Sequence, residues 1–205
     1  MRDELNTTEL CGIVATEPEF SHENHGQEFY RFTLEVERLS GSTDRIAILA
    51  LSSALTATPV TCGARVRVLG QLRTYNNRNE GGRRLVISVL ANIIAPWEGE
   101  SRNSVKLSGT LCKPPILRRT PLGRSICDVM LAVNRRYGRS DYLPCIAWGQ
   151  LAIQIGAMEV GTQLSLEGRI QSRIYSKVID GQTEERTAYE VSVMQLCPTE
   201  EIEEE

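Results

Sequence analysis

The sequence predicts an all-β chain built from two tandem five-stranded barrels, each with a short helix or helical turn after its third strand. Three observations carry this prediction. The length of 205 residues suits two domains of about 100 residues each. A pattern of glycine and apolar residues occurs twice along the chain, and inside each copy apolar residues mostly alternate with polar ones, as they do in half-buried strands.

The internal repeat has an offset of 97 residues, because residues 10–14, Leu-Cys-Gly-Ile-Val, correspond to residues 107–111, Leu-Ser-Gly-Thr-Leu. The same offset, or one residue more after an insertion, relates further pairs: Gly26 and Gly123, Arg38 and Arg135, Gly41 and Gly138, Gly63 and Gly161, Gly70 and Gly168. A repeat of this length is too long for a solenoid unit, so each copy is expected to be a domain with its own core.

In the second copy we expect strands at 105–111, 126–133, 142–147, 163–170 and 187–194. Residues 149–158 allow a short helix between the third and fourth of them. Five strands with a helix after the third is the order of an OB-fold, a Greek-key barrel. The first copy, 9–96, follows the same plan with 52–58 as a poorer helical connection. The expected boundaries are an OB-fold domain at 1–98, a linker at 99–103, a second OB-fold domain at 104–198 and an acidic tail at 199–205.

Charge is distributed unevenly over the two copies. Residues 1–100 hold 10 Lys and Arg against 13 Asp and Glu, whereas residues 101–198 hold 13 against 8. The last seven residues carry five glutamates and no base. A basic second half is typical of a nucleic-acid-binding face, although a charged stretch can equally be an ordinary solvated surface.

Several classes of function are excluded by what the sequence does not contain. No apolar run approaches the 20 or so residues of a membrane span, and no secretory signal is visible, so we expect a cytoplasmic protein. The six scattered cysteines and two histidines lack zinc-ligand spacing, and the cysteines are expected to be small core residues in a reducing compartment. Without a phosphate-binding loop or a nucleophile beside a histidine, we expect neither an enzyme nor a cofactor.

Segments of the second copy resemble bacterial single-stranded DNA-binding proteins. Residues 105–115, Val-Lys-Leu-Ser-Gly-Thr-Leu-Cys-Lys-Pro-Pro, are similar to the family's first strand, and 145–152, Cys-Ile-Ala-Trp-Gly-Gln-Leu-Ala, to its third strand and helix start. Residues 159–170, Glu-Val-Gly-Thr-Gln-Leu-Ser-Leu-Glu-Gly-Arg-Ile, resemble its fourth strand. The resemblance implies sequence-independent binding of single-stranded DNA in replication, recombination or repair, by a homodimer that presents four barrels. It also implies an acidic tail that recruits replication and repair proteins, although here the tail ends in glutamate and could simply aid solubility.

Single strands are bound by aromatic faces on which bases stack and by basic groups along the phosphates. The resemblance places Tyr137, Tyr142, Trp148 and Tyr175 at positions of base-stacking rings. Tyr142 and Trp148 are six residues apart, so a strand would place both on one face, although the apolar neighbours of Trp148 leave a core position open. Tyr175 is expected in the loop between the fourth and fifth strands.

Phosphate contacts are expected from basic residues near these rings: Arg118, Arg119, Arg135, Arg136, Arg139, Arg173 and Lys177. In the first copy, Ser40, Arg45 and Leu51 replace Tyr137, Tyr142 and Trp148, and Tyr75 remains as a loop ring with Arg73 and Arg78 beside it. We therefore expect the first copy to bind DNA weakly or chiefly to hold the assembly together. The alternative is an accessory or adaptor protein with tandem barrels, primosome-like or from a plasmid or phage, that acts mainly through protein contacts.

Overall fold

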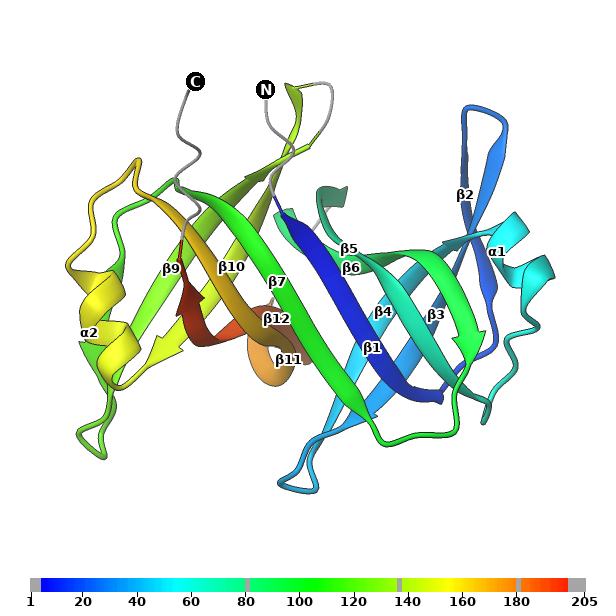
Figure 1. Cartoon of the computed structure of the whole chain (residues 1–205), viewed down its shortest axis with the longest axis horizontal. Helices are drawn as coiled ribbons and strands as arrows, with labels where there is room; N and C mark the ends of the chain where they lie inside the picture. The colour runs from blue at the N-terminus through cyan, green and yellow to red at the C-terminus, as the bar shows by residue number, and fades with distance from the viewer. Residues whose placement is uncertain (1–4, 80–81, 136–137, 180–181, 199–205) are drawn as a thin grey trace. The chain divides into compact units, whose positions relative to one another are not determined.

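The computed structural model describes residues 5–79, 82–135, 138–179 and 182–198. Along these residues the chain forms strands and two short helices in the order of Figure 1: β1 (Asn6–Val14), β2 (Glu19–Asn24), β3 (Gln27–Glu37), β4 (Thr43–Leu51), α1 (Ser52–Ala57), β5 (Arg65–Asn79), β6 (Gly82–Pro96), β7 (Arg102–Leu111), β8 (Ile116–Arg119), β9 (Ser125–Asn134), β10 (Ser140–Trp148), α2 (Gln150–Gly156), β11 (Gln163–Ile179) and β12 (Gln182–Cys197). The predicted all-β class and the two helical connections are confirmed.

The chain divides into two compact units. The N-terminal unit consists of Thr7–Ser104 and Ile170–Glu190, and the C-terminal unit of Met1–Asn6, Val105–Arg169 and Val191–Glu205. The distal halves of β11 and β12 therefore belong to the N-terminal unit, although in sequence they lie within the second copy of the repeat.

In each unit the strands close into a barrel by the same pairings. The N-terminal unit has the strand order β2-β3-β4-β6-β5-β1, and an additional β1–β3 pairing closes the sheet. The C-terminal unit has the order β8-β9-β10-β12-β11-β7, closed by β7–β9. In both units, the strand that precedes the helix pairs in parallel with the last strand of the barrel: β4 pairs with β6, and β10 pairs with β12. Closure buries the alternating apolar residues, such as Phe32, Leu34 and Ile48 in one barrel and Leu107, Leu131 and Leu143 in the other.

Two of the repeated glycine pairs, Gly12 with Gly109 and Gly70 with Gly168, mark places where two strands cross at very short range. A Cβ atom on Gly12 would lie 2.1 Å from the carbonyl oxygen of Glu35, and one on Gly109 would lie 2.5 Å from that of Ala132. In the second pair, a Cβ atom on Gly70 would lie 2.2 Å from the carbonyl oxygen of Leu90, and one on Gly168 would lie 2.3 Å from that of Ser192. These four positions have no room for a side chain, which explains why both copies of the repeat have glycine there.

A buried aspartate paired with an arginine occurs at the same place in both copies. Asp44 and Asp141 are both 0% exposed, and each accepts hydrogen bonds from an arginine six residues before it, Arg38 and Arg135 respectively. The aspartates are 97 residues apart, like the arginines. A buried carboxylate needs such a partner because desolvation of an unpaired charge is costly.

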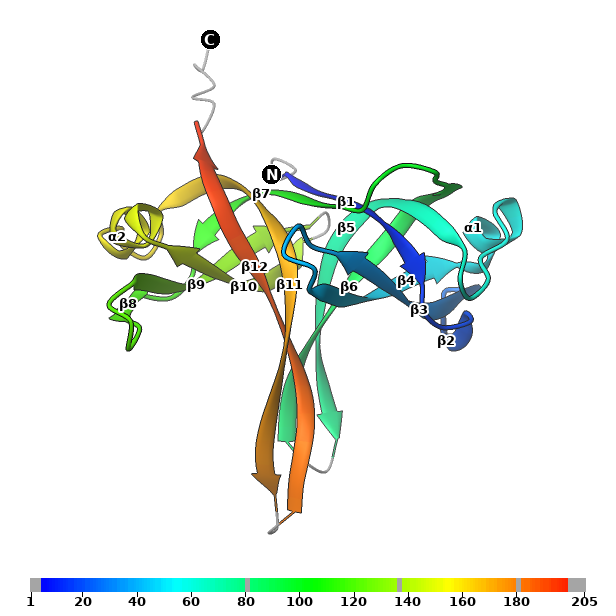
Figure 2. The same ribbon diagram turned by 90° about the horizontal axis from the view of Figure 1, so that it is seen from below.

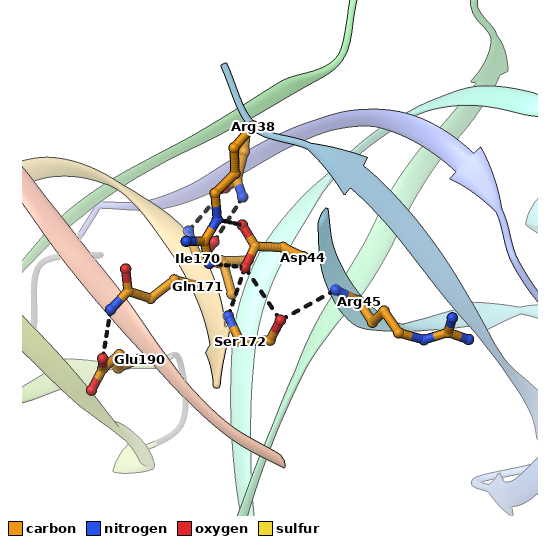
Figure 3. Close-up of polar contacts among 8 residues, drawn as sticks. Arg38, Asp44, Arg45, Ile170, Gln171, Ser172 and Glu190 are labelled. Atoms are coloured by element: carbon orange, nitrogen blue, oxygen red, sulfur yellow. Dashed lines mark hydrogen bonds and ion pairs between the residues drawn. The ribbon is translucent and has the colours of Figure 1, made fainter. Parts of the chain in front are cut away.

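Asp44 also binds the part of the β11–β12 hairpin that belongs to the N-terminal unit, as Figure 3 shows. Its carboxylate accepts hydrogen bonds from the backbone N–H of Ser172 at 2.8 Å and from the Ser172 hydroxyl at 3.2 Å. Burial alone would raise the pKa of Asp44, but the hydrogen bonds from Arg38 and Ser172 outweigh it and hold the pKa below its ordinary value. In the same unit, Asn103 donates a hydrogen bond from its side-chain amide to the backbone carbonyl of Ile170 at 2.7 Å.

The structure corrects three details of the sequence prediction. The hairpins β5–β6 and β11–β12 are much longer than expected and continue past the barrels as two-stranded ribbons (Figure 2). Two short strands, β2 and β8, follow the prolines Pro18 and Pro115 and pair with β3 and β9. Among the cysteines, Cys11, Cys127 and Cys145 are buried as expected, but Cys62 is exposed.

Candidate nucleic-acid interface

Two aromatic rings lie exposed on the outer face of β10 in the C-terminal unit. Tyr142 is 50% exposed and Trp148 is 41% exposed, so neither ring is part of the hydrophobic core. Residues 141, 143, 145 and 147 of β10 alternate with them and are buried inside the barrel. At about 3.3 Å per residue, the two Cα atoms are about 20 Å apart along the strand, which is far enough to contact separate nucleotides.

The strand register places a basic side chain in line with Trp148. On the neighbouring strands, Trp148 lies opposite Ile126, and Ile126 lies opposite Arg118 of β8. Directly opposed residues share a face of the sheet, so Arg118, Ile126 and Trp148 form one row across it. Arg118 is exposed and donates two hydrogen bonds to Asp128, at 2.6 and 3.1 Å, which hold its guanidinium beside the row.

The other basic candidates differ in how firmly they are held. Arg119 and Arg139 in the C-terminal unit are exposed, as is Arg173 on β11 in the N-terminal unit. Arg135 is half-buried and bound to Asp141, and Arg73 donates to Gln71. An exposed guanidinium can turn toward a phosphate, whereas Arg135 would have to leave a buried carboxylate. Its phosphate role stays a prediction.

Two tyrosines expected in loops lie in strands. Tyr175 belongs to β11, which pairs with β12. Tyr75 belongs to β5, because residues 65–79 pair with 82–96 along almost the whole length of the β5–β6 hairpin. Tyr75 is 51% exposed. Polar side chains suggested loops, but backbone pairing in an exposed two-stranded ribbon does not depend on apolar side chains.

Several predicted site residues cannot be placed. Arg136 and Tyr137 lie outside the described residues, as does the acidic tail from Thr199 onward. For Arg78, Tyr175 and Lys177 the structure describes the backbone within a strand but not the side chain. Their roles stay predictions.

The sequence reasoning missed a cluster of rings on the hairpin of β2 and β3 in the N-terminal unit. His22 and Phe29 stack with ring centroids 4.8 Å apart and an angle of 5° between their planes. Phe20 and Tyr30 meet edge to face at 6.0 Å. The available signal was two rings before a tight turn, Phe20 and His22, and two after it, Phe29 and Tyr30. The turn residues, His25 and Gly26, both have positive φ, as a two-residue hairpin loop requires.

A small barrel with exposed rings beside arginines defines an oligonucleotide-binding class of site, and comparisons with known proteins agree. The single-strand binding protein family matches residues 102–197. A single-stranded DNA-binding protein of Streptococcus agalactiae is 33% identical over 101 residues, which cover 46% of this chain and 76% of that protein. The chain belongs to the single-strand binding protein family.

Similarity also extends over both copies of the repeat. A single-stranded DNA-binding protein of Thermus thermophilus is 28% identical over 196 residues, covering 81% of this chain and 74% of that protein. The crystal structure of the wild-type single-stranded DNA binding protein from Thermus aquaticus superposes with a TM-score of 0.78 at 24% identity, over 97% of this chain and 95% of that one. This likeness confirms the fold of two tandem OB-folds.

The family is one of binding proteins, in agreement with the expectation that the chain is not an enzyme. Within the described residues, no helix is long and apolar enough to cross a lipid bilayer.

Proposed function

We propose that the chain binds single-stranded DNA without sequence preference, through base stacking and phosphate contacts. The observation that carries this proposal is the pair of exposed rings on the outer face of β10, Tyr142 and Trp148, with Arg118 in the same row across the sheet as Trp148. Any base can stack on a ring, so stacking gives affinity without selecting a sequence. The similar proteins of Thermus and Streptococcus are named for the same ligand.

The proposed contacts divide by chemistry. Stacking is assigned to Tyr137, Tyr142, Trp148, Tyr175 and Tyr75, and phosphate binding to Arg118, Arg119, Arg135, Arg136, Arg139, Arg173, Lys177, Arg73 and Arg78. The functional domains are 1–98 and 104–198, joined by the linker 99–103 and followed by the tail 199–205. The protein coats and protects strands exposed in replication, recombination or repair, in the cytoplasm at the nucleoid. It acts as a homodimer with four barrels, and its tail contacts replication and repair proteins.

Tryptophan fluorescence tests this proposal directly, because the chain has two tryptophans in different settings. Trp148 is exposed on β10, whereas Trp97 is half-buried, lies under the guanidinium of Arg67 and donates its Nε1–H to the backbone carbonyl of Glu100 at 2.9 Å. Titration of the protein with a 35-nucleotide oligo(dT) should quench Trp148. Trp148→Ala should remove the quenching and weaken binding by about 1–3 kcal/mol, the contribution of one stacked base.

Trp97→Phe is the matched control, and it should keep both the affinity and the quenching. Wild-type affinity in Trp148→Ala would contradict the assigned face. A salt titration separates the adaptor alternative, since phosphate contacts make affinity fall steeply with salt concentration, with a slope of about 0.7 per phosphate for single strands. A protein that meets DNA only through a partner would show no such binding on its own.

A further inference from the structure

The N-terminal barrel has an aromatic ring, Phe29, in the strand pair that corresponds to the one holding Trp148 in the C-terminal barrel. Trp148 is on the second strand of its pair, β10, whereas Phe29 is on the first strand, β3. In the C-terminal unit, Trp148 lies directly opposite Ile126. The corresponding pair in the N-terminal unit, 97 residues earlier, is Leu51 opposite Phe29. The ring and the aliphatic side chain have exchanged strands, and because opposed residues share a face, the ring still lies on the outer face of its barrel.

We infer that Phe29 and His22 form a second base-stacking site, on the N-terminal barrel, that holds unpaired nucleotides of the same single strand. This inference rests on the proposed function and extends it to the copy that has lost the rings at positions 40, 45 and 51. The site belongs to the hairpin of β2 and β3, shown in blue in Figure 1.

His22 stacks on Phe29 and presents a ring of its own to solvent. The pairing of β2 with β3 shifts register between Phe20 and His22, so that His22 lies opposite Phe29 while Phe20 lies opposite Tyr30. The two pairs therefore face opposite sides of the hairpin. His22 is exposed, and its plane is within 5° of that of Phe29, so a base stacked on His22 would continue a parallel stack.

A groove beside this stack has the size and lining for nucleobases. It has a volume of about 470 Å³ and is open to solvent, and Phe29, Leu51 and Leu90 supply its apolar part. Gln27, Ser53 and Asn92 line it as well and provide hydrogen-bonding groups that can meet the edge of a base. Apolar walls with a few polar groups are typical of sites for planar organic groups.

Local charge explains how this site would differ from the one on β10. Arg31 is exposed two residues along β3 from Phe29, but Glu19 lies directly opposite it, and Arg45 is paired with Glu35 farther along the same face. Cations and carboxylates on the face therefore nearly balance. Binding there is expected to depend mainly on stacking, with a smaller salt dependence than binding at Trp148.

The test uses the full-length chain and a 60-nucleotide oligo(dT), long enough for both barrels to be occupied together. Phe29→Ala removes the ring, and Phe29→Leu removes it while keeping apolar volume in this half-buried position. Both variants should weaken binding at least about fivefold, which corresponds to the lower end of the contribution of one stacked base. Phe20→Ala is the matched control, because it removes a ring that is 59% exposed on the other side of the same hairpin. It should change the affinity less than twofold.

Photocross-linking of the wild-type chain to the same oligonucleotide carrying iodouracil gives an independent readout. Cross-linked peptides that contain His22 or Phe29 support the inference. Weakened binding in Trp148→Ala together with wild-type affinity in Phe29→Leu and no such peptide would overturn the second site and leave the proposed function intact. Wild-type binding in Trp148→Ala would overturn the proposed function itself. A change of sedimentation mass in Phe29→Leu, with DNA affinity unchanged, would assign the face to contact between copies of the chain and would also overturn the inference.

Discussion

The two barrels share a framework but not a surface. Gly12 and Gly109 lie at equivalent close strand crossings in the two barrels, and Asp44 and Asp141 are buried beside an arginine in the same way. On the outer faces, by contrast, Trp148 and Tyr142 correspond to Leu51 and Arg45. Closure of a small barrel depends on a few positions that tolerate no change. An exposed face is under no such constraint, so one copy can specialise for a ligand while the other diverges.

The strongest test of the shared framework is to add one methyl group where the strands cross. In Gly12→Ala the new Cβ would lie 2.1 Å from the oxygen of Glu35, and in Gly109→Ala 2.5 Å from that of Ala132. Since a backbone carbonyl cannot move away without breaking the barrel, both changes should cost about 3 kcal/mol or more, with Gly12→Ala the more severe. Chemical denaturation measures this cost.

Ile13→Ala serves as the control, because Ile13 is the next residue on β1 and is 40% exposed. Its effect should stay below that of either glycine variant. If Gly12→Ala unfolded at the wild-type denaturant concentration, the crossing would not limit the fold, and the comparison between the copies would lose its structural basis.

The buried carboxylates give the next largest effect. Asp44→Asn keeps the shape of the side chain but removes the charge that Arg38 and Ser172 bind, so it should destabilise the protein by about 1–3 kcal/mol at neutral pH. Because the pKa of Asp44 is lowered in the folded state, its contribution is fully present above the ordinary aspartate pKa of about 4 and is lost as the pH falls through the lower folded value.

The melting temperature, measured from pH 6 down to pH 2, checks this sign. The wild-type protein should lose more stability at the acid end than Asp44→Asn does, so the two curves should converge there. Asp128→Asn is the control, since Asp128 forms an ion pair with Arg118 in which both side chains are exposed, and such pairs contribute little. Parallel curves for the wild type and Asp44→Asn would contradict the assigned role of the buried charge.

Much of this comparison could be predicted from the sequence, because the repeat and the period-two alternation record local backbone geometry and burial. Those signals placed both barrels and both helices, and they put Tyr142 and Trp148 on one face of a strand, although they left open whether Trp148 belongs to the core. The length of the β11–β12 hairpin could not be predicted, since backbone pairing leaves no clear pattern in polar side chains. The aspartates at 44 and 141 were missed because a charged residue in a strand suggests exposure, although each follows its arginine by six residues in both copies.

The rings of the N-terminal barrel were missed for a geometric reason. When the two copies are aligned position by position, Trp148 corresponds to Leu51, so the first copy has no ring at this position. The replacement, Phe29, is 22 residues earlier in the chain and lies opposite Leu51 only once β3 and β4 are paired. Surface equivalence in a sheet therefore depends on register, which a linear comparison does not contain.

The smallest expected effect concerns the arginines around the exposed rings, and it sharpens the distinction between stacking and phosphate contacts. Arg139 is exposed, and its replacement by glutamine should lower the salt slope of oligo(dT) binding by about 0.7, the value for one phosphate contact on a single strand. Arg118→Gln should lower it less, because Arg118 must exchange Asp128 for a phosphate and so gains less from the new contact. Affinities measured between about 50 and 300 mM salt would show both slopes. An equal drop in the two variants would mean that the ion pair with Asp128 does not restrain Arg118 when DNA binds, and an unchanged slope in Arg139→Gln would remove that residue from the phosphate path.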